Sequence, residues 1–319
     1  MMNGEGEGPR PDKSVDPGPK ETESQGELFP RDSFSSGPAA EEPKIKRLVY
    51  PIWTENKAKL IERYLYYFVL ITKHGTYIDG FAGPQKPGKP DLWAAKLVLE
   101  SEPRWLRHFY LFDRRRAQVA RLNHLKAEQP TTDAYGRLIN REIRVEEGDF
   151  NVLVHDLLRS GRISGTEAAF CLLDQTTFQC HWSTVKALSD HKAEGEHKIE
   201  LFYFLATGWM RRALCAVKTG KILENWWGRN DWAKVREMQP LEISQELVRR
   251  LKEELGYESV KAWPIYERQS GGRIMYHMIH ATDHPHAPHL ISRAYDRAVQ
   301  AKESPEQCLF DFAEDLKEI

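Results

Sequence analysis

The sequence predicts a doubly wound α/β domain with a mostly parallel sheet, and three observations carry this prediction. Five short apolar runs recur along the chain, each followed by an amphipathic stretch of helical period. Several of the runs are apolar almost without interruption, which is typical of strands buried on both faces. After the fifth run the alternation stops, and a Gly-rich connection joins two further strand-like segments. We therefore expect a parallel sheet with a C-terminal antiparallel hairpin.

The first predicted element is a helix over Thr54–Val69, with Thr54 as its N-cap. Leu60, Tyr64 and Tyr67 recur there at helical spacing. We expect five strands to follow, at Thr76–Phe81, His108–Asp113, Ile143–Gly148, Ala168–Asp174 and Lys198–Ala206. We expect the helices between them at Asp91–Glu100, Arg116–Glu128, Phe150–Arg159 and Trp182–Asp190.

A helical insertion is expected near residues 208–257, where three tryptophans cluster before a charged amphipathic stretch. The hairpin strands are expected at Val260–Arg268 and Arg273–Thr282. A parallel sheet closed by such a hairpin is the architecture of class I methyltransferases. The period of the pattern does not by itself distinguish this class from other doubly wound folds.

Residues 1–46 differ in composition from the rest of the chain. They hold seven of the 18 prolines and six of the 21 glycines, and almost no aliphatic side chains. Such a segment buries too little apolar surface to offset the entropy lost on ordering. We therefore predict a disordered tail over residues 1–46 and one folded domain over residues 47–319.

The overall composition narrows the class of protein. The 319 residues are 40% hydrophobic and 29% charged, and the formal net charge of −1 excludes a broad electropositive surface. No apolar run approaches the roughly 20 residues of a membrane span, and the N-terminus lacks the apolar core of a signal peptide. Four cysteines without a close pair indicate reduced thiols. We expect a cytoplasmic protein that does not contact a membrane.

The ends of the first three predicted strands suggest a ligand site, because open α/β sheets bind ligands beyond the carboxyl ends of their strands. Small residues after the first strand allow a close backbone approach to a ligand. A carboxylate after the second strand commonly accepts ribose hydroxyls, and one after the third could meet an adenine amine. The alternative is that these residues only form turns and helix caps. The predicted cofactor-binding residues are Asp79, Gly80, Phe81, Gly83, Asp113 and Asp149.

The end of the fourth predicted strand is where the reacting group would lie. Asp174 could accept a hydrogen bond from an amine nucleophile, assisted by Gln175 or Thr176. Phe178 could stack on a planar substrate. Equally, Asp174 could cap the next helix and Phe178 could belong to the core.

Two further patterns have both a functional and an ordinary explanation. His284, His286 and His289 invite a metal hypothesis, but no cysteine or carboxylate pair completes a site, so we expect a surface loop and no metal. Arginine pairs such as Arg211-Arg212 and Arg249-Arg250, near the tryptophans, could form a nucleic-acid groove. Solvated helix faces and a buried aromatic cluster are the alternative.

Several motifs together resemble the three-Cys-motif partner family (TcmP) over roughly residues 50–300. This resemblance implies a methyltransferase-like Rossmann domain, S-adenosylmethionine as cofactor, a bacterial cytoplasmic protein and a partner bearing a three-cysteine motif. The motifs are Trp53-Thr54, Lys57, Leu60, Tyr64, Tyr77-Ile78-Asp79-Gly80-Phe81-Ala82-Gly83-Pro84, Gly148-Asp149, Leu173-Asp174, Trp227-Gly228, Trp232 and Ala281-Thr282-Asp283-His284-Pro285.

The chain also departs from the family pattern. Pro84 leads into Gln85-Lys86-Pro87-Gly88 instead of a glycine, and the proline and glycine expected after Asp174 are missing. These departures bear on catalysis more than on binding. The sequence therefore predicts an S-adenosylmethionine-dependent methyltransferase, with nucleic acid as one candidate substrate. It leaves open a catalytically reduced scaffold, or a metal-dependent nuclease-like enzyme using Asp79, Asp113 and Asp174.

Overall fold

A seven-stranded sheet lies at the centre of the structure, a computed structural model that describes residues 52–84, 92–133, 135–192, 195–268 and 271–300. Within these residues the strand order is β3-β2-β1-β4-β5-β7-β6. The strands are β1 (Thr76–Asp79), β2 (His108–Asp113), β3 (Glu142–Glu147), β4 (Ala169–Leu173), β5 (Glu200–Leu205), β6 (Ser259–Arg268) and β7 (Gly271–Thr282). Strands β1 to β5 pair in parallel, and β7 is antiparallel to both β5 and β6. The predicted α/β class, the mostly parallel sheet and the C-terminal hairpin are confirmed.

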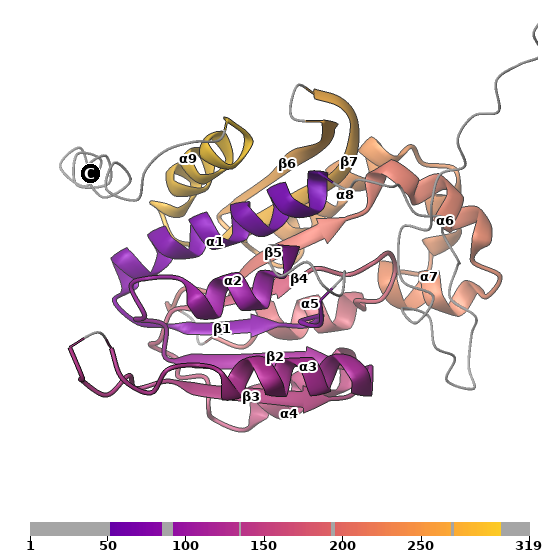
Figure 1. Ribbon diagram of the computed structural model, residues 1–319. Coiled ribbons are helices and arrows are strands. Elements are labelled where there is room, and N and C mark those ends of the chain that lie inside the picture. The colour runs from indigo at the N-terminus through magenta and orange to yellow at the C-terminus, as the bar shows by residue number, and fades with distance from the viewer. Residues whose placement is uncertain (1–51, 85–91, 134, 193–194, 269–270, 301–319) are drawn as a thin grey trace, which may run out of the picture.

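Helices cover both faces of the sheet (Figure 1). One layer contains α1 (Ile52–Thr72), α2 (Ala94–Glu100), α3 (Arg116–Ala127) and α9 (Ala287–Gln300). The other contains α4 (Phe150–Arg159) and α5 (Trp182–Ser189). This arrangement follows from the parallel strands, because each crossover must return across a face of the sheet.

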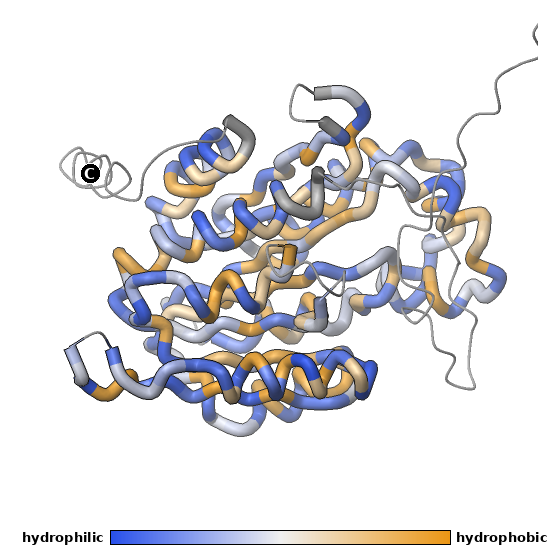
Figure 2. The backbone as a smooth tube through the Cα atoms, viewed as in Figure 1, coloured by the Kyte–Doolittle hydropathy of each residue, from blue (hydrophilic) through white to orange (hydrophobic). Residues whose placement is uncertain are grey.

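The core lies between these layers. All residues of β4 and β5 are buried, as their nearly continuous apolar runs predict. Aromatic rings fill the space between α1 and the sheet, where Tyr64, Phe170 and Phe202 lie with ring centroids 4.7 to 5.9 Å apart. Figure 2 shows the hydrophobic colour concentrated in the central strands, while the helices carry alternating bands.

The predicted helical insertion lies between β5 and β6. It consists of the 3₁₀ helices η3 (Thr207–Trp209) and η4 (Trp232–Arg236) and the helices α6 (Met210–Ala216), α7 (Gly220–Trp227) and α8 (Pro240–Glu253). Helix α7 is capped at its C-terminus by Gly228, which adopts the left-handed conformation that favours glycine. A Cβ atom at this position would also collide with Trp182 of α5, so the glycine permits close packing of the two helices.

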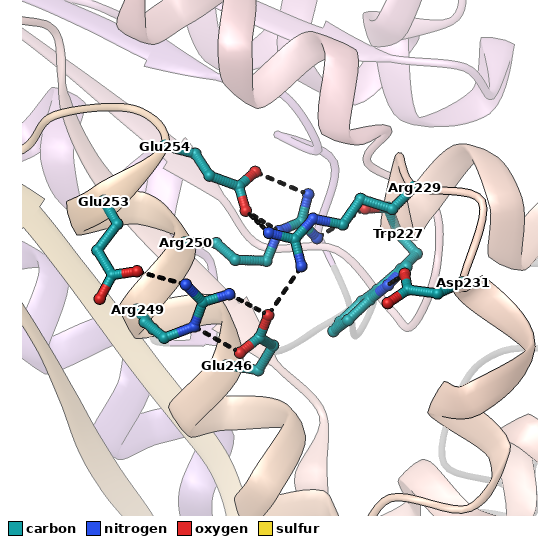
Figure 3. Close-up of polar contacts among 8 residues, drawn as sticks. All are labelled: Trp227, Arg229, Asp231, Glu246, Arg249, Arg250, Glu253 and Glu254. Carbon is teal, nitrogen blue, oxygen red and sulfur yellow. Dashed lines mark hydrogen bonds and ion pairs between the residues drawn. The ribbon is translucent and has the colours of Figure 1, made fainter.

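A network of arginines and glutamates joins α7 to α8 (Figure 3). Arg250 is fully buried, lies over the rings of Trp182 and Trp227, and donates to the Trp227 carbonyl at 2.7 Å. Its guanidinium also pairs with Glu254 at 3.0 Å. The remaining members pair with one another around it: Arg229 with Glu246 and Glu254, and Arg249 with Glu246 and Glu253.

Two local predictions are wrong. Helix α1 begins at Ile52, so Thr54 lies inside its first turn and is not the N-cap. The histidine segment is not wholly a surface loop, because His289 belongs to α9, which the sequence analysis did not predict. Helix α9 forms because Leu290, Ile291 and Ala294 are buried on one face, and its Arg297 donates to the Tyr67 hydroxyl of α1 at 2.8 Å. The predicted disordered tail, residues 1–46, lies outside the described residues.

Candidate functional site

The order of the sheet reverses direction between β1 and β4. The chain builds β1, β2 and β3 outward on one side, then crosses back to form β4 and β5 on the other. In Figure 1, β1 and β2 run from left to right, so their carboxyl ends face the right side of the view. Ligands of open α/β sheets bind at such a switch point.

The register brings three carboxylates to this point. Asp79, the last residue of β1, lies level with Leu111 of β2 and Leu172 of β4. Asp113, the last residue of β2, and Asp174, the first residue after β4, each lie two positions further along the chain than these partners. They therefore flank the turn that follows Asp79. Three acidic residues far apart in the sequence converge at one edge of the sheet.

Asp79 is buried, with 1% of its surface exposed. Its carboxylate accepts hydrogen bonds from the Phe81 amide and the Tyr77 hydroxyl, both at 3.0 Å. Burial raises the pKa of this carboxyl from 3.8 to about 7, and the negative charges of Asp174 and Asp113 add to the rise. The two hydrogen bonds oppose this effect but do not cancel it.

Asp113 connects the loop after β1 to the end of β2. Its Oδ2 accepts from the Gly83 amide at 3.2 Å, and its Oδ1 accepts from the Arg115 amide at 2.8 Å. Glycine is required at position 83, because a Cβ atom there would clash with this carboxylate and lie 2.7 Å from Gln118 Cβ. The glycine therefore allows a close contact between the loop backbone and the Asp113 side chain, rather than between the backbone and a ligand.

Asp149 caps α4 and is exposed. Its Oδ1 accepts from the Asn151 amide and from Asn151 Nδ2, both at 2.9 Å. Among the described residues its Oδ2 accepts no hydrogen bond, so this oxygen is available to a ligand. Helix α4 also packs under the turn after β1, because a Cβ atom at Gly80 would lie 2.6 Å from the Phe150 ring. Phe81 is half-buried and meets the same ring edge-on.

Asp174 has a partner that the sequence analysis did not identify as part of the site. Lys57 of α1 donates to Asp174 Oδ1 at 2.6 Å. The Lys57 side chain is 2% exposed, and its ammonium lies 4.6 Å from the ring centroid of Tyr276 and 5.0 Å from that of Phe204. The ion pair holds the carboxylate in a fixed direction. The two residues are 117 positions apart, so no local pattern could reveal the pair.

The other residues predicted near the reacting group differ in their access to a ligand. Gln175 is 1% exposed, and its Oε1 accepts from the Cys180 amide at 2.9 Å. Thr176 is half-buried, and its amide donates to Gln179 Oε1 at 2.9 Å. Phe178 is 4% exposed and packs edge-on against Trp226. This packing favours a structural role for Gln175 and Phe178. Of the three residues, only Thr176 is partly exposed and could contact a substrate.

Several residues of the candidate nucleic-acid groove make structural contacts. Trp226 and Trp227 are buried, and Arg250 is enclosed between Trp182 and Trp227. Arg211 donates to Gln239 at 2.7 Å. These contacts favour the alternative explanation, in which the aromatic residues belong to the core and the charges to paired helix faces.

The described residues lack both a cluster of metal ligands and a membrane-spanning helix. They contain no group of three or more His, Cys, Asp or Glu side chains placed to hold a metal ion. None of the helices in the same residues combines the length and apolar character needed to cross a bilayer. The loop residues Gln85 to Gly88, which depart from the family pattern, lie outside the described part.

No protein-family model matches the chain, and no curated protein matches it. The resemblance to the three-Cys-motif partner family therefore stays a prediction that rests on the motifs.

Proposed function

We propose that this protein binds S-adenosylmethionine at the carboxyl ends of β1, β2 and β3 and transfers its methyl group to a substrate beside Asp174. The supporting observation is the convergence of Asp79, Asp113 and Asp174 at the switch point of the sheet. The strand order, with an antiparallel β7 between β5 and β6, is also typical of class I methyltransferases. Nucleic acid is one candidate substrate.

The residues of the site fit this cofactor in their charge and in the hydrogen-bond acceptors that they provide. S-adenosylmethionine carries a net positive charge, and four acidic side chains lie at the strand ends that form the site: Asp79, Asp113, Asp149 and Asp174. Asp149 has an oxygen available for an amine. Asp113 Oδ1 accepts from both the amide and the Nε of Arg115, whereas Oδ2 accepts from the Gly83 amide alone and retains capacity for a hydroxyl donor.

The bound cofactor would supply a methyl group already activated for displacement by its sulfonium. The protein then has to hold the nucleophile in line and exclude water. Asp174 accepts a hydrogen bond from the nucleophile and keeps its lone pair directed at the methyl group. Lys57 fixes the orientation of the Asp174 carboxylate through the 2.6 Å contact. Thr176, at the same strand end, offers a hydroxyl that helps to position the substrate.

The family resemblance adds two proposals about context. It implies a protein partner that bears a three-cysteine motif and a cytoplasmic location. A scaffold that keeps the fold and has lost turnover is the alternative within the same family. Binding and turnover therefore need separate measurements.

Calorimetric titration of S-adenosylmethionine and S-adenosylhomocysteine into the full chain tests the site. We expect micromolar affinity, and a loss of about 100-fold or more in Asp113→Ala. Asp156→Ala removes an exposed aspartate that pairs with Arg159 on α4, so it should bind the cofactor normally. Absence of binding at millimolar cofactor would overturn the proposal.

Transfer of labelled methyl to candidate substrates tests catalysis separately. Asp174→Asn should retain cofactor binding and lose turnover, because the amide cannot accept on both atoms. Binding by the unaltered chain without turnover on any substrate class would favour the scaffold alternative. Unchanged turnover in Asp174→Asn would rule out the role given to this residue.

A further inference from the structure

A cavity of about 110 Å³ lies at the opposite, amino-terminal edge of the sheet. It is bounded by the end of α1, the starts of β4, β5 and α9, and the end of β7. Its wall includes Tyr64, Phe68, Glu167 and Glu200. The site proposed above is formed by the other ends of the strands, so this cavity is separate from it.

Glu200 is the distinctive group in the cavity wall. The residue is 5% exposed, and its Oε1 accepts hydrogen bonds from both the Tyr64 hydroxyl and His280 Nε2. Burial and the neighbouring Glu200 carboxylate raise the pKa of Tyr64 well above its usual value, so the phenol stays a donor. Both donors reach the same oxygen. Among the described residues, Oε2 accepts no hydrogen bond.

The other acidic residue deep in the wall is already used by the protein. Glu167 accepts from Thr76 at 3.2 Å and pairs with His108 at 3.0 Å. The nearby cation Lys198 is also engaged, since it pairs with Asp283 at 3.3 Å and donates to the Gly256 carbonyl at 3.2 Å. Glu196 also lines the cavity but is exposed, so Glu200 Oε2 is the oxygen of a buried acidic side chain in this wall that can accept a hydrogen bond from a ligand.

The surroundings of Glu200 favour a cationic donor over an anion or a neutral group. The Tyr64 and Phe68 rings line the cavity, and ring faces attract ammonium ions. Thr72, at the C-terminal end of α1, also lines it, and helix C-termini carry partial negative charge. Burial and the neighbouring imidazoles of His197 and His286 lower the pKa of His284, so this ring adds no positive charge at neutral pH.

We propose that this cavity binds a small primary aliphatic ammonium ion, with Glu200 Oε2 as its anionic partner and the rings of Tyr64 and Phe68 around its alkyl and ammonium groups. The cavity size suits a chain of a few carbons, about that of n-butylammonium. A primary ammonium supplies donors to the free carboxylate oxygen and leaves an alkyl group to contact the apolar wall at Ala169 and Leu290.

Titration of n-butylammonium chloride into the full chain, followed by ligand-observed NMR and calorimetry at pH 7.5, tests the proposal. We expect millimolar or tighter binding, with the neutral isostere n-butanol weaker by about tenfold or more. Glu200→Gln keeps the shape of the side chain and should weaken n-butylammonium by a similar factor. Glu147→Gln, an exposed glutamate at the end of β3, is the matched control and should change nothing.

A second variant guards against misfolding of Glu200→Gln, because Glu200 contacts two buried side chains. Ala168→Leu fills the cavity and leaves all charges in place, so it should weaken n-butylammonium while the circular dichroism spectrum stays native. Equal binding of n-butanol, or normal binding by Glu200→Gln, would overturn the proposal in favour of a purely apolar or water-filled cavity. No binding at about 50 mM would overturn it as well.

Discussion

Two clusters of charged residues in this protein use charge in opposite ways. In the network between α7 and α8, every arginine meets at least one glutamate, and Glu246 accepts from both Arg229 and Arg249. At the ends of β1, β2 and β4, three acidic side chains converge, with Lys57 paired to Asp174 and Arg115 paired to Asp113. The first cluster holds two helices together. The second brings acidic side chains close enough for Asp174 and Asp113 to raise the pKa of Asp79.

The pKa directions express the same contrast. Hydrogen bonds and attraction from Arg249, followed by Arg229, lower the pKa of Glu246. Burial raises the pKa of Asp79 to about 7, with help from two like charges. The contacts of this network therefore favour the ionised form of Glu246. A perturbed acid at a switch point favours a functional site, because the protein tolerates an unfavourable charge there.

Asp79→Asn should have the largest effect on stability. The folded pKa of about 7 lies above the ordinary 3.8, so the native state binds more protons than the unfolded chain between pH 4 and 7. Stability from this group is therefore present at pH 4 and lost as the pH rises through 7. The variant should equal the wild type at pH 4 and exceed it by about 4 kcal/mol at pH 8.

Urea unfolding of both chains between pH 4 and 8 measures this difference. Subtracting the two curves removes the titration of every other group. A difference that is independent of pH would mean that Asp79 ionises normally, and the contrast between the two clusters would fail. Loss of cofactor affinity in the more stable variant would be the expected trade of stability for function.

Arg250→Ala should give the second largest effect, with the opposite sign. The substitution leaves the Trp227 carbonyl without its donor, weakens the pairing of Glu254 and empties the space between two tryptophan rings. Removing one partner of a buried pair is strongly destabilising, and we expect a loss of about 3 kcal/mol in the free energy of unfolding. Urea unfolding at constant m-value measures it.

Arg249→Ala is the matched control, on the same helix and one residue earlier. Its guanidinium pairs with Glu246 and Glu253 at the surface, so its loss should hardly move the unfolding midpoint. If both variants destabilised the protein equally, burial of Arg250 would not be what secures α7 to α8.

The two clusters also differ in how far the sequence predicted them. Asp79, Asp113 and Asp149 lie at or just after strand ends, and because strand ends follow from local apolar patterns, the sequence predicts their position at the carboxyl-end edge of the sheet. The Lys57–Asp174 pair, the Glu200–Tyr64 contact and the docking of α9 on α1 depend on residues far apart in the chain. The spacing of apolar residues predicts which face of a helix or strand is buried. It does not predict which buried polar side chains from different elements contact each other.

Gly83→Ala tests whether the loop after β1 is matched to Asp113. A Cβ atom would displace the Asp113 carboxylate or Gln118, and overpacking of this kind costs about 2 kcal/mol. The same displacement should weaken S-adenosylmethionine by about tenfold. Gly165→Ala is the control, because no atom lies within 4 Å of the added Cβ, and it should leave stability and affinity nearly unchanged. Unaltered cofactor affinity in Gly83→Ala would separate Asp113 from the binding site.

The smallest expected effect concerns the rim of the arginine network. Arg229 meets Glu246 at 3.0 Å, with their side chains 32% and 21% exposed. Because solvent reaches both groups, a double-mutant cycle of Arg229→Ala and Glu246→Ala should give a coupling energy of about 0.5 kcal/mol at low salt. In about 1 M NaCl screening should remove most of it. The Asp79→Asn difference at pH 8 should persist in the same salt, because burial, its main cause, is not screened. If salt removed the Asp79→Asn stability difference and left the Arg229–Glu246 coupling energy unchanged, Asp79 would be the screened group and the arginine pair the buried one. The contrast drawn between the two clusters would then be wrong.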